Sequence, residues 1–446
     1  MAISWMKKDI CTYEGILAAP LEIDERSIFF KDYGSIIYRS QFRRLSNKTQ
    51  VFLNPYVDFP RTRLTHSIEV EQIGRELSRY FTKLVINKIS TLSDSDKESF
   101  GKHFEDLVAA ACLAHDLGQA PFGHRGEQTL QELMANEKTI KQQDYFEANK
   151  QNIRILIGTE GRKPYGVSCE LIESIMKYNS SIFNQNNNKY PGYYSHESQV
   201  INLIQKCTSI RHPACYIMEV SDDISYISSD IQDALKLKLI STDQIREEFK
   251  SIKFPEQQGN LNIHNWDEAL KDCTDNDFTK ITSLLIKCML ETVKRTLENF
   301  FKMWAARDNI TDLPQKMYDY FQAGDCELNL LYFGEGEPFK KLKKSIYRDY
   351  LLQDKEIARS ELLAKKVLTD LWSIMVQELT DENFEKTDFF KIIPNYVQKN
   401  IMNAHRTSQF QEQKFQYLSD YLSGMTDRYA IFLWTQIFDP TKLKFM

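Results

Sequence analysis

The chain has 446 residues, of which 42% are hydrophobic and 27% charged, as expected for a globular protein with a large buried core. Its net charge of −5 gives no overall attraction to nucleic acid or to anionic membranes. No apolar run approaches the about 20 residues that span a bilayer, and none follows the N-terminal lysines, so we expect a cytoplasmic protein without membrane contacts.

Helical periodicity dominates the chain. In residues 76–89, the apolar side chains of Leu77, Tyr80, Phe81 and Leu84 have the i, i+3, i+4, i+7 spacing of one helix face. Similar patterns predict long helices over 103–118, 213–235, 281–304 and 360–379. The chain has only 12 prolines and 16 glycines, which turn-rich β proteins use heavily, so the sequence predicts an all-α fold.

The sequence shows no internal repeat and no clear linker. We expect a helical core over residues 1–240 and a C-terminal helical part over residues 241–446 packed on it. Residues 90–103, rich in Ser and Asp, are expected to form a loop. The basic run in residues 339–352 is expected to be a solvated helix face, with phosphate or subunit contact as the alternative.

Four side chains that can bind metals or transfer protons are concentrated in "CLAHDLGQAPFGHRGEQ", residues 112–128. A lone His or Asp at a helix end is usually a cap or a hydrogen-bonded core group. Here His115 and Asp116 follow "LVAAACLA", which is apolar enough to be buried, and a buried carboxylate needs a partner such as a cation. The stretch therefore indicates either a polar helix junction or half of an active site.

Further ligands of the same type occur elsewhere in the chain. His66 begins an amphipathic helix, and Asp222 and Asp223 lie on a helix that is otherwise apolar on one face. Two imidazoles and two carboxylates suit Mg, Mn, Fe or Co, whereas the absence of any C-x-x-C pair argues against a thiolate zinc site. Tyr226 and Asp230 share a helix face with either aspartate, so spacing does not decide between the two.

Six segments of the chain form a pattern by their order and spacing: "FRRLSNKTQVF" (42–52), "RTRLTHSIEV" (61–70), "HDLGQAPFGHRGE" (115–127), "IMKY" (175–178), "RHPACYIMEVSDDISYISSDIQDA" (211–234) and "DYLSGMTDRYA" (420–430). This pattern resembles the deoxyguanosine triphosphate triphosphohydrolase family of the HD-domain superfamily, which implies that residues 1–240 form an HD-domain catalytic core. Residues from about 240 to 415 carry no motif that we can assign.

The resemblance implies a divalent metal held by His66, His115 and Asp116. The family pattern of a metal-binding Asp, a Tyr four residues later and an Asp eight residues later implies Asp222 as the fourth ligand. Mg or Mn is the expected ion, with Fe or Co as alternatives.

The resemblance also implies that His124 and Glu127 are catalytic residues beside the α-phosphate. At i and i+3 of a helix they face one way, and the carboxylate would orient the imidazole and favour its charged form. Water would be the nucleophile. The alternative is an ordinary surface ion pair.

Seven residues match substrate-binding positions of the family. Arg63 is expected at the triphosphate, with Lys177, Tyr178 and Lys189 as weaker matches there, Gln50 at the sugar, and Tyr226 and Asp230 at the 3′-hydroxyl. For Lys177 and Lys189 the alternative is a solvated side chain, and for Tyr226 it is packing in the core.

The resemblance therefore implies hydrolysis of a deoxynucleoside triphosphate, with dGTP as the expected substrate, to deoxynucleoside and inorganic triphosphate. One alternative is another HD-domain phosphohydrolase that acts on nucleotides. Another is a nucleotide-sensing or single-stranded-DNA-binding protein of this fold. Such a sensor would be expected to have lost a metal-binding residue or the His124–Glu127 pair, and this sequence retains all of them. A homo-oligomer is expected, and binding of single-stranded DNA beside catalysis stays open.

Overall fold

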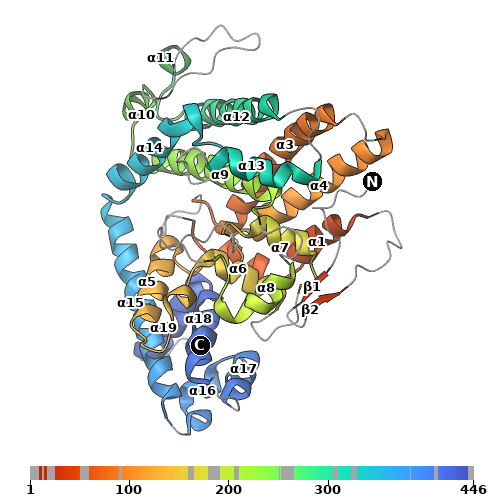
Figure 1. Ribbon diagram of the computed structural model, residues 1–446. Helices are drawn as coiled ribbons and strands as arrows, with labels where there is room; N and C mark the ends of the chain where they lie inside the picture. The colour runs from red at the N-terminus through yellow and green to blue at the C-terminus, as the bar shows by residue number, and fades with distance from the viewer. Residues whose placement is uncertain are drawn as a thin grey trace. The chain divides into compact units, whose positions relative to one another are not determined.

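The structure, a computed structural model, describes most of the chain (Figure 1). The described residues are 10–12, 15–17, 26–50, 60–89, 93–158, 165–178, 191–204, 210–250, 252, 266–304, 310–322, 329–381, 383–405 and 410–439. Helices make up nearly all of their regular structure, which confirms the all-α prediction. The strands among them are β1 (Ile10–Thr12) and β2 (Gly15–Leu17), which pair antiparallel as a short hairpin.

The chain forms two compact units, each assembled from separated segments. Unit 1 contains the described residues of 66–112 and 210–358, and unit 2 those of 8–65, 113–209 and 359–446. The sequence predicts a division near residue 240 between a motif-bearing core and a C-terminal helical part. Residue 240 lies inside unit 1, which is defined by its internal contacts, so the division between the two predicted parts stays a prediction.

Unit 1 is built around long helices. The helices wholly or mostly in it are α3 (Arg63–Lys88), α4 (Asp94–Ala114), α9 (Pro213–Lys236), α10 (Thr242–Phe249), α11 (Trp266–Ala269), α12 (Phe278–Met303), α13 (Leu313–Gln322), α14 (Glu337–Ser345) and a π-helical turn (Ile346–Leu351). Helix α9 packs along α12, which buries Leu285, Met289 and Val293 at four-residue spacing. Helices α3 and α4 approach so closely that a Cβ at Gly74 would lie 2.6 Å from Cys112 Sγ.

Unit 2 is also helical. Its helices are α1 (Ile28–Ile37), α2 (Ser40–Arg44), α5 (Gly123–Ala135), α6 (Ala148–Ile157), α7 (Cys169–Ile175), α8 (Ser198–Ile204), α15 (Lys355–Leu379), α16 (Asp388–Ile392), α17 (Asn395–His405), α18 (Phe410–Ser423) and α19 (Asp427–Phe438). One apolar cluster joins Leu130 of α5 with Leu371 and Trp372 of α15 and Leu422 of α18. The C-terminal family segment is thus part of the core that supports α5.

Short 3₁₀ turns connect several helices. They span Leu45–Asn47, Gln142–Asp144, Ser195–Glu197, Ile310–Asp312, Gly334–Gly336 and Phe384–Lys386.

The loop expected over 90–103 is wrong for its described part, because α4 begins at Asp94. Ser93 caps the helix: its hydroxyl accepts a hydrogen bond from the Asp96 N–H at 3.1 Å. Asp94 and Asp96 in the first turn also suit the positive end of the helix dipole. The polar composition of this segment therefore marks the start of a helix and not a loop.

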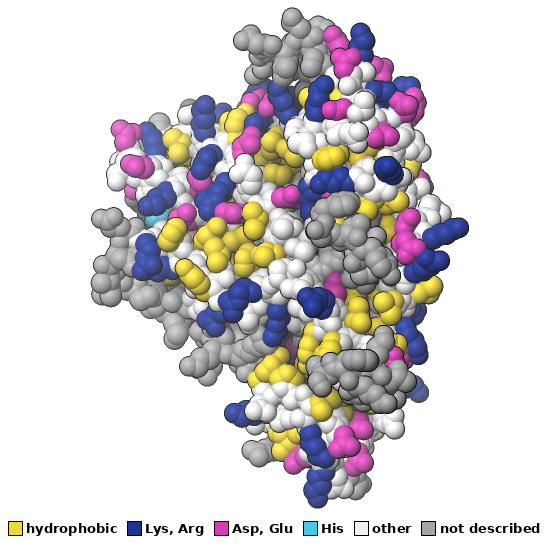
Figure 2. Space-filling view, turned by 180° about the vertical axis from the view of Figure 1, so that it is seen from behind, with side chains coloured by type: hydrophobic (Ala, Val, Ile, Leu, Met, Phe, Trp, Pro, Cys, Tyr) yellow, Lys and Arg dark blue, Asp and Glu magenta, His cyan; other side chains and the backbone are white. Residues whose placement is uncertain are grey.

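Two further features bear on partners. Among the described residues, no helix is long and apolar enough to cross a membrane. On the face drawn in Figure 2, the described Lys and Arg side chains are interspersed with Asp and Glu rather than gathered into a patch of one sign.

Candidate functional site

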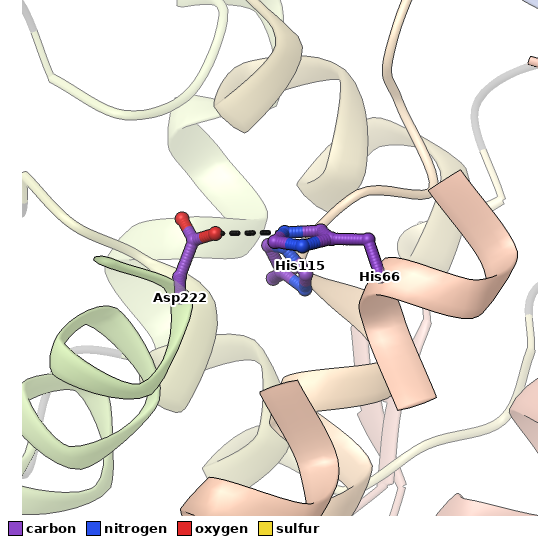
Figure 3. Close-up of side chains that lie close together, drawn as sticks. All are labelled: His66, His115 and Asp222. Carbon is purple, nitrogen blue, oxygen red and sulfur yellow. Dashed lines mark hydrogen bonds and ion pairs between the residues drawn. The ribbon is translucent and has the colours of Figure 1, made fainter. Parts of the chain in front are cut away.

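In unit 1, His66 and Asp222 form a hydrogen-bonded pair. His66 lies in the first turn of α3, Asp222 lies on α9, and His66 Nε2 is 3.0 Å from Asp222 Oδ1 (Figure 3). The histidine is fully buried, whereas the Asp222 side chain is 22% exposed. Both residues are of metal-binding type, as is His115 of unit 2, which Figure 3 also draws. The pair thus presents an imidazole nitrogen and a carboxylate oxygen at one point.

Asp223 has different contacts from its neighbour Asp222. Its Oδ2 accepts a hydrogen bond from Asn329 Nδ2 at 2.6 Å, and its Oδ1 accepts one from Lys343 Nζ. Burial raises the pKa of Asp223, and the Lys343 ammonium opposes that rise. Spacing left the choice between the two aspartates open, and the structure places Asp222 at His66.

In unit 2, His115 and Asp116 lie in the turn that follows α4. The turn packs closely against α6 at Gly118, where a side chain has no room because a Cβ would lie 2.6 Å from the backbone nitrogen of Asn152. The Asn152 amide fixes the turn from both sides: its Oδ1 accepts from Gly118 N at 2.6 Å, and its Nδ2 donates to the His115 carbonyl. The His–Asp dipeptide is therefore held rigidly by α6.

Arg63 contacts a predicted metal ligand within unit 2. Its Nη1 donates to Asp116 Oδ2 at 3.1 Å, and its Nη2 lies 3.4 Å from the Gln50 carbonyl oxygen. Both Arg63 and Asp116 are buried. The other Asp116 oxygen, Oδ1, lies 3.6 Å from His115 Nε2. One carboxylate thus connects the guanidinium expected at the triphosphate with the His115 imidazole.

His124 and Glu127 share one face of α5, as expected from sequence. His124 Nδ1 lies 3.9 Å from Glu127 Oε2, and the His124 side chain is half exposed. Glu127 Oε1 accepts a hydrogen bond from Ala148 N at 2.8 Å. Burial raises the pKa of Glu127, but contacts with His124, the Ala148 amide and the Arg63 charge outweigh it, so the net pKa is lowered. The result is a fixed, ionised carboxylate beside an accessible imidazole, as acid–base chemistry requires.

The turn before α5 has an unusual backbone. Phe122 adopts a left-handed φ of 66°, which a side chain rarely takes without support. Gly126 is needed one turn later, because a Cβ there would lie 1.7 Å from the Pro121 carbonyl oxygen. Such strain persists only where neighbouring groups fix it, and it is common at functional sites.

Asp427 provides that support, and sequence reasoning gave it no role. It is buried, and its Oδ1 accepts from Phe122 N while Oδ2 accepts from Thr49 N, both at 2.8 Å. One carboxylate therefore fixes the turn before α5 and the backbone at Thr49, next to Gln50. Asp427 lies in the C-terminal family segment, residues 420–430, and that motif match is the sequence signal that could have identified it.

Gln50 is 3% exposed, and neither its Nε2 nor its Oε1 has a hydrogen-bond partner within the described part of the chain. Leaving a buried polar group unpaired costs about 1–3 kcal/mol. The amide is thus well suited to a polar ligand; that this ligand is the sugar stays a prediction.

The remaining candidates are distributed over both units. Tyr226 and Asp230 are buried on α9 in unit 1, one and two turns beyond Asp222. Lys177 and Tyr178 follow α7 in unit 2 and are partly buried. Lys189 lies outside the described residues.

Comparisons with known proteins agree with the motifs. Residues 63–205 match the HD domain, and residues 337–436 match the phosphohydrolase-associated domain. A deoxyguanosinetriphosphate triphosphohydrolase-like protein of Listeria monocytogenes is 26% identical and aligns over 91% of this chain and 93% of its own length. A protein of the same description from Rickettsia prowazekii is 27% identical over 93% of this chain and 92% of its own. The resemblance predicted from the motifs is confirmed: the chain matches an HD domain and a phosphohydrolase-associated domain, and it is similar over nearly its whole length to deoxyguanosinetriphosphate triphosphohydrolase-like proteins, which supports a phosphohydrolase activity.

Proposed function

We propose that the chain hydrolyses a deoxynucleoside triphosphate, with dGTP as the expected substrate, to deoxynucleoside and inorganic triphosphate in a metal-dependent reaction. The observation that carries this proposal is the His66–Asp222 pair, in which a fully buried imidazole nitrogen lies 3.0 Å from a partly exposed carboxylate oxygen. The description shared by the relatives supports the substrate class.

The proposed ligand set is His66 and Asp222 of unit 1 with His115 and Asp116 of unit 2. Support comes from the residue types, their order in the family motifs, and the rigid support of each half within its own unit. A bound Mg or Mn ion would polarise the α-phosphate and lower the pKa of a water molecule.

The protein's own groups would position substrate and move protons. Water would attack the α-phosphorus, and the bond from phosphorus to the 5′-oxygen would break, so that this oxygen takes up a proton and leaves with the nucleoside. We assign proton transfer to His124, whose imidazole is half exposed. Glu127 would orient that imidazole. Arg63 would bind triphosphate oxygens, since a guanidinium can make two parallel hydrogen bonds to them. Lys177, Tyr178 and Lys189 are proposed as further phosphate contacts.

The sugar would be recognised by three buried residues. Gln50 and Asp230 would hydrogen-bond the 3′-hydroxyl, and Tyr226 would occupy the space that a ribose 2′-hydroxyl needs. The Gln50 amide, which has no hydrogen-bond partner among the described residues, supports this assignment. Homo-oligomer formation and single-stranded-DNA binding stay predictions from the resemblance, and a cytoplasmic location stays a prediction from the sequence composition.

The test is incubation of the purified chain with each of the four deoxynucleoside triphosphates and their ribonucleotide counterparts, with Mg or Mn. Chromatography would detect inorganic triphosphate and nucleoside. Release of diphosphate or monophosphate instead would contradict the proposed bond cleavage, and no release from any substrate would refute the activity.

A further inference from the structure

Lys343 lies on α14, in a stretch to which no motif could be assigned from sequence, and it contacts α9, the helix that carries Asp222 and Tyr226. Its Nζ lies 4.7 Å from the centre of the Tyr226 ring and donates a hydrogen bond to Asp223 Oδ1. The Lys343 side chain is 35% exposed and the Asp223 side chain 11%. The basic run was expected to be a solvated helix face; for Lys343 that expectation is wrong, because the residue pairs with a buried carboxylate.

The Asp223 carboxylate is itself fixed by a second element. Asn329 donates to Asp223 Oδ2 at 2.6 Å, and Asn329 Oδ1 accepts from Leu331 N at 2.9 Å. The turn carrying these groups fits tightly before α14, since a Cβ at Gly336 would lie 1.5 Å from the Leu331 carbonyl oxygen. Lys343 is therefore held by a chain of short polar contacts, and its ammonium has a defined position over the ring.

We infer that Lys343 is a positioning residue for Tyr226: held by Asp223, its ammonium fixes the ring and thereby sets discrimination between deoxyribose and ribose. This inference rests on the proposed function, in which Tyr226 faces the sugar. A cation over the face of an aromatic ring is attracted to it, and more strongly where both are removed from water. Selectivity depends on a ring that cannot move aside, since a ring free to tilt would admit the 2′-hydroxyl.

The alternative role for this lysine is direct contact with substrate phosphates. The two roles predict different kinetics. A phosphate contact would weaken deoxy and ribo substrates equally, because both carry the same triphosphate. A lysine that fixes Tyr226 would change the ratio between them.

The experiment compares Lys343→Met and Lys343→Gln, which remove the charge at similar length, with Lys343→Arg, which keeps a cation. Lys344→Met is the matched control, since Lys344 is the next residue of α14 and is exposed. The readout is kcat/KM for a deoxynucleoside triphosphate divided by that for the matching ribonucleotide. Thermal unfolding and metal content show that each variant is folded and loaded.

We expect the ratio to fall about 3- to 30-fold in the Met and Gln variants, mainly through gained turnover of the ribonucleotide. It should return toward the unmodified value with Arg and stay unchanged in the control. An unchanged ratio with KM raised equally for both substrates would overturn the inference while leaving the proposed function intact. Failure of the unmodified protein to hydrolyse either nucleotide would refute the proposed function, and the inference with it.

Discussion

His66 Nε2 and Asp222 Oδ1 lie 3.0 Å apart, between the start of α3 and the middle of α9. The next residue on α9, Asp223, pairs instead with Lys343 and Asn329. Two adjacent carboxylates therefore have separate tasks: one lies at a candidate metal ligand, and the other ties α9 to the segment before and within α14.

This division predicts different outcomes for two matched substitutions. Asp222→Asn should remove most bound metal and nearly all turnover, because an amide is a poor substitute for a charged ligand. Asp223→Asn should keep the metal within about 10- to 100-fold of normal affinity, the usual range for loss of an outer contact. Metal analysis of both purified variants decides the matter. Metal loss only in the Asp223 variant would reverse the ligand assignment.

Glu127 is expected to act in chemistry rather than in substrate binding. Glu127→Gln keeps an oxygen that can accept from the Ala148 N–H but removes the charge beside His124. Turnover should fall about 10²–10⁴-fold with metal retained, the range for a lost acid–base group. Steady-state kinetics gives the answer, with Glu132→Gln on the same helix as a control whose kcat should be normal. A rise in KM at constant kcat would make Glu127 a binding residue.

Asp427 is expected to stabilise the fold and the site together. Asp427→Ala leaves the buried Phe122 N–H and the Thr49 N–H without their acceptor, which should lower the free energy of unfolding by about 1–3 kcal/mol. Urea unfolding measures the loss. The exposed Asp388, which pairs with Lys391 one helical turn away, supplies a control, and Asp388→Asn should have an effect of at most about 0.5 kcal/mol. Equal effects of the two substitutions would show that the Asp427 contacts carry no special weight.

Asp32 should make stability depend on pH. Burial raises its pKa from 3.8 to about 7, against the opposing hydrogen bonds from the Ser168 hydroxyl and amide. The folded chain then holds this proton more tightly than the unfolded chain. Its contribution to the free energy of unfolding is complete below pH about 4 and is lost as pH rises through about 7.

Asp32→Asn should remove that slope. Urea unfolding at several pH values between 5 and 8 is the measurement, and Asp243→Asn, an exposed residue of α10, is the control that should keep the slope. A slope that persists unchanged in Asp32→Asn would assign the pH dependence to other groups.

Sequence alone predicted the helical class, the helices that carry His66, His124 and Asp222, and the single face shared by His124 and Glu127, because these follow from local periodicity. It did not predict Asp427 or Lys343. Their roles depend on contacts with residues far away in the chain, Thr49 and Phe122 in one case and Tyr226 in the other. Spacing also could not separate Asp222 from Asp223, because two successive helical residues point about 100° apart and their partners lie on other elements.

The sugar prediction tests the substrate class most directly. A site that hydrogen-bonds the 3′-hydroxyl and has no room for a 2′-hydroxyl should hydrolyse a deoxynucleoside triphosphate and hydrolyse the matching ribonucleotide very little. A 2′,3′-dideoxy substrate should also be poor, because the buried polar groups of Gln50 and Asp230 would then lack their ligand. Tyr226→Ala should relax rejection of the ribonucleotide more than it harms the deoxy substrate. The measurement is kcat/KM for the three sugars in the unmodified protein and in Tyr226→Ala. Equal values for ribo and deoxy substrates in the unmodified protein would remove the deoxy assignment and leave a phosphohydrolase of broader nucleotide range.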